Sequence, residues 1–172
     1  KISEEFEGTL LKMAKTPIPA NDIGKYCDYS GLVSLSRSCH PIGLINAGNI
    51  DHALEDIYEV GQVYNSANSK GIHWAGLVVT AIAAATKHNA TVDSTIDAIF
   101  ENCNRMTNEY LGFKEDNPVD ELKKGLEIAE ECKDFRELRV AFKDLYSGEG
   151  VPYPYSYANE VVTKGIAIFK MV

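Results

Sequence analysis

The segment Ser36–His40 (SRSCH) places reactive and polar side chains directly before Pro41 and an apolar run. Proline suits the first turn of a helix, where a backbone N–H would have no intrahelical partner. The free N–H groups of a helix start, with an arginine beside them, attract anions. The pattern is consistent with an anion or substrate site at Ser36 and Arg37. Serine and histidine side chains also cap helices without any ligand, and that structural explanation stays open.

A second candidate for binding is the polar loop 63–71, VYNSANSKG, between two strongly helical patterns. Ser69 has a structural explanation as the N-cap of the following helix. Asn65, Ser66 and Asn68 are not needed for capping, and they offer donors and acceptors without charge. Since binding residues are often carried on loops, we expect these three residues to recognise a sugar or a nucleobase through hydrogen bonds.

Other chemistry-bearing residues have simpler explanations. His73 stands alone on an apolar helical pattern, where a histidine is usually a hydrogen-bonded core residue. The acids between Asp51 and Glu59 begin a predicted helix, where the dipole favours negative charge, and a solvated face explains them better than a metal site. The sequence contains no G-x-S-x-G, H-E-x-x-H, phosphate-loop or EF-hand motif. No residue is therefore assigned a catalytic role.

The composition limits the classes of partner. The 172 residues are 45% hydrophobic and carry a net charge of −8 without a basic stripe, which argues against a nucleic-acid partner. The longest apolar stretch, 72–85, is shorter than the roughly 18 to 20 residues that span a bilayer, so it is expected to be a buried core helix rather than a membrane segment. The four cysteines show neither a C-x-x-C pair nor zinc-ligand spacing, which favours reduced thiols and a cytoplasmic location, although two disulfides remain possible by count.

The apolar periodicity is helical along almost the whole chain. It predicts one all-α globular bundle over residues 1–172, with no strands. The chain starts at Lys1 rather than Met, and its last apolar pattern, Phe169–Val172, has no C-terminal cap. These features predict a fragment cut at both ends, the middle of a larger domain. Helices are expected at 3–15, 21–29, 41–48, 49–64, 71–87, 92–103, 119–129, 135–145 and from 159 to the end.

The order of these segments resembles the central part of the ADP-ribosylglycohydrolase family. Its members show an arginine followed closely by Pro-x-Gly, an acid-rich helix, a short polar loop and a long alanine-rich helix. Arg37, Pro41–Gly43, the loop 65–69 and the helix 74–85 match that order here. The segment 157–169, YANEVVTKGIAIF, looks like the Glu-containing helix that precedes the last functional motif of the family.

This resemblance implies a hydrolase that cleaves a glycosidic bond of ADP-ribose or a related ribosyl conjugate, small or protein-linked. It also implies a binuclear Mg²⁺ site, held by a Thr-Asp-Asp and an Asp-x-Asp-Thr motif. Neither motif occurs in these residues, so we expect the metal ligands to lie outside this chain and the segment alone to be inactive. The substrate-binding residues would be Ser36, Arg37, Asn65, Ser66 and Asn68.

Two further interpretations stay open at this point. One is a hydrolase of the same fold that acts on another ribosyl compound, such as a nucleoside. The other is a non-catalytic helical protein of this fold, either crystallin-like or an interaction domain. The spacing from Arg37 to Pro41 is one residue longer than usual in the family, and a histidine common in the family's polar loop is missing, with Ser66-Ala67 at that place.

Overall fold

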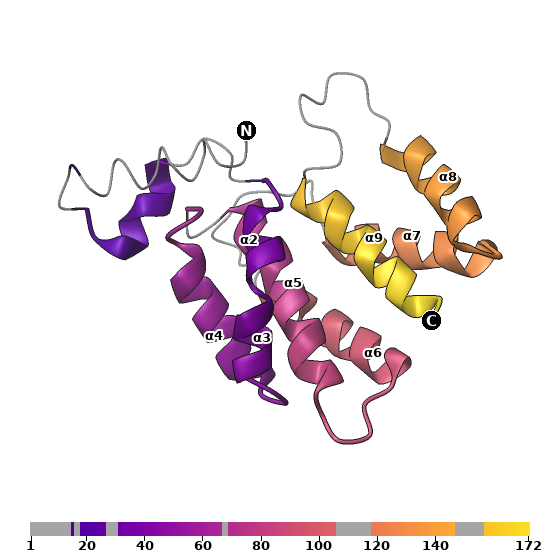
Figure 1. The fold of residues 1–172 in the computed structure, drawn as a ribbon, viewed down its shortest axis with the longest axis horizontal. Coiled ribbons are helices and arrows are strands. Elements are labelled where there is room, and N and C mark those ends of the chain that lie inside the picture. The colour runs from indigo at the N-terminus through magenta and orange to yellow at the C-terminus, as the bar shows by residue number, and fades with distance from the viewer. Residues whose placement is uncertain (1–14, 16–17, 27–30, 67–68, 106–117, 147–156) are drawn as a thin grey trace.

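The computed structural model describes residues 15, 18–26, 31–66, 69–105, 118–146 and 157–172 (Figure 1). These residues are mainly helical and contain no strand, with a single isolated bridge between Leu32 and Tyr157. The predicted all-α fold is confirmed. The elements are the 3₁₀ helices η1 (Ala20–Tyr26) and η2 (Cys103–Arg105) and the α-helices α2 (Ser34–Ser38), α3 (His40–Ile45), α4 (Ile50–Gly61), α5 (Lys70–Ala85), α6 (Val92–Asn102), α7 (Pro118–Glu131), α8 (Phe135–Tyr146) and α9 (Ala158–Lys170).

The central element is α5, which is buried nearly all round, as its apolar sequence predicts. It begins after Ser69, whose side chain accepts the backbone N–H of Ile72 at 3.3 Å. In Figure 1, α2, α3 and α4 lie on one side of α5, and α7, α8 and α9 lie on the other. The helix therefore joins two halves of the chain that are distant in sequence.

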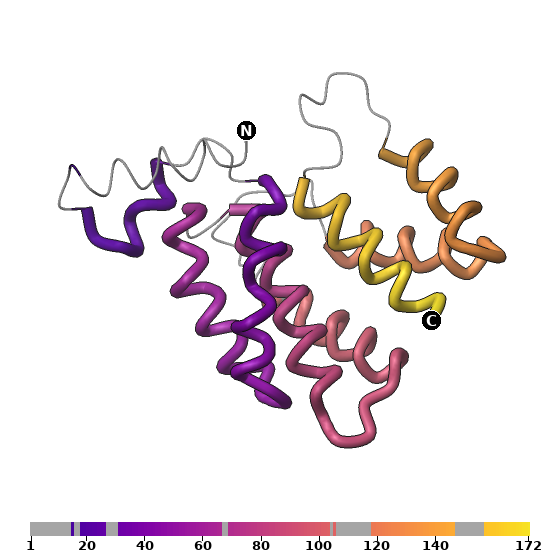
Figure 2. Tube along the Cα trace, viewed as in Figure 1, coloured from indigo at the N-terminus to yellow at the C-terminus, as the bar shows by residue number. Residues whose placement is uncertain are grey.

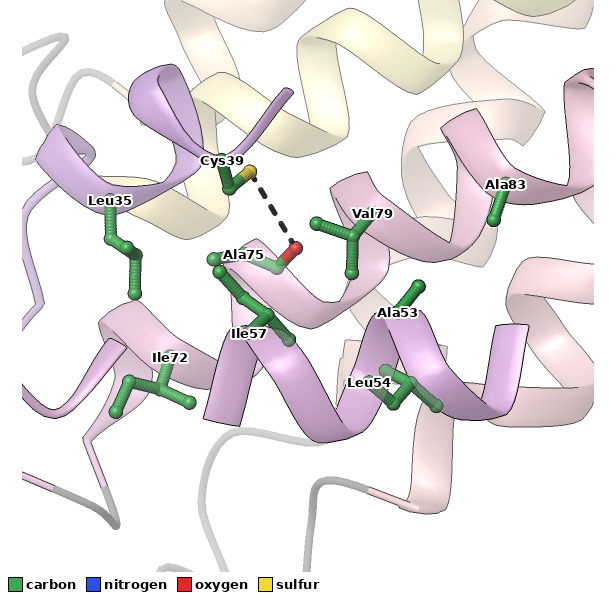
Figure 3. Close-up of a cluster of buried hydrophobic side chains, with 9 residues drawn as sticks. All are labelled: Leu35, Cys39, Ala53, Leu54, Ile57, Ile72, Ala75, Val79 and Ala83. Atoms are coloured by element: carbon green, nitrogen blue, oxygen red, sulfur yellow. Dashed lines mark hydrogen bonds between the residues drawn. The ribbon is translucent and has the colours of Figure 1, made fainter. Parts of the chain in front are cut away.

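The first core lies between α5 and the helices α2 to α4 (Figure 3). Ala53 and Ile57 of α4 and Ile72 of α5 are fully buried there. Gly61 allows the C-terminal end of α4 to contact α5 closely, because a Cβ added to this glycine would lie 2.9 Å from Cγ1 of Ile72. Small residues on both helices thus bring their axes close together.

Two further cores complete the bundle. One surrounds Trp74, with α6, α7 and α9 packed against α5, and includes Ile99 and Leu122. The other joins α7, α8 and α9 around Leu138 and Phe142. The helix α8 contributes only to this last core, at the edge of the molecule.

Several details differ from the sequence prediction. Val60, an apolar residue of α4, is 45% exposed, because Leu54 and Gly61 are the residues near it that face the core. Phe135 is apolar but is 54% exposed at the first residue of α8. The helix predicted at 21–29 is the 3₁₀ helix η1, and the one predicted at 3–15 falls outside the described residues, apart from Lys15.

Cys39, Cys103 and Cys132 are free thiols, as predicted, whereas Cys27 lies outside the described residues. Across the described part of the chain, no helix combines the length and the apolar character needed to cross a membrane.

Candidate functional site

The segment Ser36–His40 forms two short helices, α2 and α3, separated only by Cys39. Figure 2 shows that the chain passes from one helix to the other almost in line. The N–H groups of Ile42 and Gly43 bond to the carbonyl of Cys39, at 2.9 and 3.4 Å. The second helix therefore continues the first and does not offer an open row of N–H groups. The expected anion site at a free helix start is not formed here.

The capping explanation for this segment is also wrong. Neither α2 nor α3 has a side-chain cap at its N-terminus. The hydroxyl of Ser38 instead donates to the carbonyl of Ser34, at 2.9 Å, which is the back-bonding that serine adopts within a helix. The Nδ1 atom of His40 lies 2.9 Å from the carbonyl oxygen of Arg37, so the ring contacts the backbone of α2 and does not cap α3.

Ser36 and Arg37 point in different directions, because consecutive helical residues are rotated by roughly 100°. Ser36 is 4% exposed, and its hydroxyl oxygen has no hydrogen-bond partner among the described residues. Arg37 is exposed, and no described residue forms an ion pair with its guanidinium. One residue thus offers an unpartnered polar atom inside the fold and the next offers a free cation at the surface.

Cys39 is the most reactive residue type in the segment, yet it is fully buried. Its Sγ lies 3.3 Å from the carbonyl oxygen of Ser36 and 3.9 Å from that of Ala75 (Figure 3). Burial raises the pKa of this thiol to about 12. Because the thiolate is the nucleophile, Cys39 is a core residue rather than a catalytic one.

Asn65 lies beneath the 3₁₀ helix η1 and is 2% exposed. Its backbone carbonyl meets Gly24 so closely that an added Cβ would lie 2.1 Å from the oxygen, and Gly24 donates its N–H to the carbonyl of Gln62 at 2.8 Å. The Oδ1 atom of Asn65 has no described partner. A buried amide oxygen left in this way costs about 1–3 kcal/mol, unless water or a ligand supplies a hydrogen bond.

The remaining predicted loop residues are less closely defined. Ser66 is half-buried, and its carbonyl accepts the N–H of Ser69 at 2.9 Å. Asn68 lies outside the described residues. The prediction that Ser69 caps the next helix is confirmed.

His73 is half-buried in the second turn of α5. Burial lowers the pKa of its imidazole to about 4, so the ring is neutral at pH 7. No hydrogen bond to the ring is present within the described ranges, which differs from the hydrogen-bonded core histidine expected from sequence.

The described residues do not assemble a metal site. They contain no group of three or more His, Cys, Asp or Glu side chains that fits an ion. On α4, Asp51 pairs with Arg105 at 2.6 Å, and Asp56 accepts a hydrogen bond from Asn46 at 2.7 Å. These partners agree with the solvated acidic face expected from sequence.

The structure thus groups the predicted site residues only in part. Ser36 and Asn65 share burial and an unpartnered oxygen, whereas Arg37 lies at the surface. Within the described residues, no hydrogen bond joins Arg37 to Asn65 or Ser66.

A cavity of about 650 Å³, which the sequence analysis does not predict, lies between α8 and α9. The apolar residues in its lining include Phe135 and Ile168, and its cations include Arg139 and Lys143. The sequence does carry one indication of this cavity. Arg139 and Lys143 follow Phe135 at intervals of four residues, so all three lie on one face of α8.

The chain was compared with protein-family models, curated proteins and solved structures, and none of them matches it.

Proposed function

We propose that this chain forms the helical scaffold and one side of the substrate-binding site in a hydrolase of the ADP-ribosylglycohydrolase type. The observation that carries the proposal is the packing around α5. The helices α2, α3, α4 and α9 all contact α5. Each of these helices includes a segment that resembles the family, so motifs from both halves of the chain meet on one alanine-rich helix.

Arg37 would bind a phosphate of ADP-ribose. Its guanidinium is exposed and without a described ion pair, and arginine recognises phosphate through paired N–H groups. The positive charge is local, because the chain as a whole carries −8.

The polar residues Ser36, Asn65, Ser66 and Asn68 would line the sugar side of the site. The unpartnered oxygens of Ser36 and Asn65 support this role, since buried polar atoms almost always have a partner, either protein, water or ligand. A ribose hydroxyl donates hydrogen bonds of the kind that the Asn65 oxygen lacks.

The Mg²⁺ ions of the proposed function are implied only by the resemblance to the family. A pair of Mg²⁺ ions would polarise the ribose hydroxyls and activate water when bound. The described residues do not fit such a site, and the two acidic motifs of the family are absent from the 172 residues. The chain's own residues would therefore bind and orient substrate, while the metal ligands would come from elsewhere in the intact protein.

A release assay tests this function. In the intact protein with Mg²⁺, we expect release of ADP-ribose from ADP-ribosyl-arginine. Arg37→Ala should raise KM at least about fivefold, as expected for a lost charge-assisted phosphate contact, while Arg136→Ala, an exposed arginine on α8, should leave KM unchanged. An unchanged KM for Arg37→Ala would remove that residue from the site.

The same assay separates the alternatives. Release from free nucleosides but not from ADP-ribosyl-arginine would indicate the nucleoside-type hydrolase. No release from either substrate would favour the non-catalytic helical protein. That alternative is supported by the absence of the family's two acidic motifs and of its polar-loop histidine from these 172 residues.

A further inference from the structure

The cavity between α8 and α9 has an apolar floor and an open apolar edge. Leu138 and Phe142 are 2% and 3% exposed, so they form the floor. Phe135 and Ile168 are 54% and 46% exposed and line the edge. These two large apolar side chains lie on facing helices and remain about half exposed to water. Covering them with an apolar group would lower the free energy.

Three cations line the same cavity. Arg139 and Lys143 lie one helical turn apart on α8, are exposed, and form no ion pair within the described residues. Lys164 extends from α9 on the other side. In a chain with a net charge of −8, this concentration of positive charge is a local exception.

The position of Lys164 is fixed by a polar layer beside the cavity. Its Nζ atom pairs with Glu160, which is 5% exposed, and lies 5.2 Å from the centre of the Tyr146 ring. The hydroxyl of Tyr146 donates to Oε1 of Glu121 on α7 at 2.7 Å. Lys164 is therefore already paired, whereas Arg139 and Lys143 have no ion-pair partner among the residues that the structure describes.

The size and chemistry of the cavity favour one kind of occupant. A volume of about 650 Å³ lies within the usual range for small-molecule sites, about 300–1,000 Å³, and suits a molecule rather than a helix of a partner protein. The apolar floor and edge require a hydrocarbon part. The two cations on α8, which form no ion pair within the described residues, favour an anionic head.

We propose that the groove between α8 and α9 binds a single-tailed anionic amphiphile, such as a long-chain carboxylate. The tail lies on Leu138 and Phe142, between Phe135 and Ile168. The carboxylate faces Arg139 and Lys143. This site is separate from the residues proposed to bind ADP-ribose, so either proposal can fail without the other.

Calorimetric titration of the 172-residue chain with three probes tests the proposal. Dodecanoate, kept below its micelle concentration, should bind with a saturable one-site isotherm. Acetate has the same head without the tail, and dodecyltrimethylammonium has the same tail with the opposite charge. Both should bind at least about tenfold more weakly, because each lacks one of the two interactions.

Charge and tail contacts are tested by matched variants. The double variant Arg139→Glu/Lys143→Glu should weaken dodecanoate binding about tenfold, while Lys123→Glu/Lys124→Glu, on the exposed part of α7, should not change it. Phe135→Ser should also weaken binding, and Val140→Ser should not. Val140 is the control because it is 61% exposed on the same helix but does not line the cavity.

The variants replace exposed side chains, and circular dichroism checks that each one is folded. Three results would overturn the proposal: no saturable binding of dodecanoate, equal affinity for the cationic probe, or equal losses in the groove variants and their controls. Equal affinity for the cationic probe would mean that the groove is only an apolar surface.

Discussion

At the scale of single residues, burial determines what the thiol of Cys39 can do. Its pKa of about 12 leaves about one part in ten thousand as thiolate at pH 8. We expect Cys39 to resist iodoacetamide in the folded protein and to react fully in urea. Cys132 is only half-buried and should react faster in the folded state. Mass spectrometry of the alkylated peptides measures both rates, and equal rates would show that Cys39 is accessible.

The imidazole of His73 predicts a pH dependence of stability. Its pKa is about 4 in the folded state, because burial disfavours the charged ring, and about 6.5 in the unfolded chain. Between these values the unfolded state binds more protons, so stability falls as the pH drops from 6.5 to 4 and loses nothing further below that. The full contribution is up to about 3 kcal/mol.

Urea unfolding between pH 4 and 7 measures this effect against a matched control. His73→Gln removes the titrating group and should lose less stability than the wild type as the pH falls. His88→Gln, at an exposed histidine in a turn, should behave like the wild type. A His73→Gln curve parallel to that of the wild type would contradict the assignment.

At the scale of elements, two glycines report how closely α7 and α9 pack. A Cβ added to Gly125 would lie 2.4 Å from Cγ2 of Thr163, whereas one added to Gly165 would meet nothing within 4 Å. Gly125→Ala should therefore cost about 1–3 kcal/mol, since the two helices must move apart. Gly165→Ala should stabilise the protein by about 0.5–1 kcal/mol, because alanine is the better helix former. Thermal or urea unfolding of both variants checks the signs, and destabilisation of equal size at both positions would show that the contact is not specific.

The helices themselves were largely predictable, because their caps and periodicity are local features. Thr91 caps α6 in a capping box with Ser94, and Asn49 caps α4, as their residue types suggest. The orientation of a helix around its axis depends on tertiary contacts instead. The exposure of Val60 and Phe135 could not be read from a pattern that counts both as apolar.

The candidate site was less predictable for a related reason. A row of polar residues does not say which ones point inward, and Ser36 and Arg37 are neighbours with opposite environments. The continuous path from α2 into α3 also removes the free helix start that Pro41 suggested. Both outcomes depend on how α2 and α3 pack against α5. This packing cannot be read from the residue types of the segment itself.

At the scale of the whole molecule, α5 connects two regions with different surfaces. On one side, α2 to α4 carry Arg37 and the hydroxyl oxygen of Ser36, neither of which has a partner within the described part of the chain. On the other, α8 and α9 enclose the cation-lined cavity. We propose one role for each region, ADP-ribose binding for the first and amphiphile binding for the second.

The most direct test of the central proposal is titration of the isotopically labelled 172-residue chain with ADP-ribose, followed by the backbone amide signals in NMR. We expect saturable shifts at Ser36, Arg37, Asn65 and Ser66, weakened in Arg37→Ala and unchanged in Arg136→Ala. An absence of shifts at these residues, or shifts confined to α8 and α9, would contradict a substrate-binding wall on this side of the molecule.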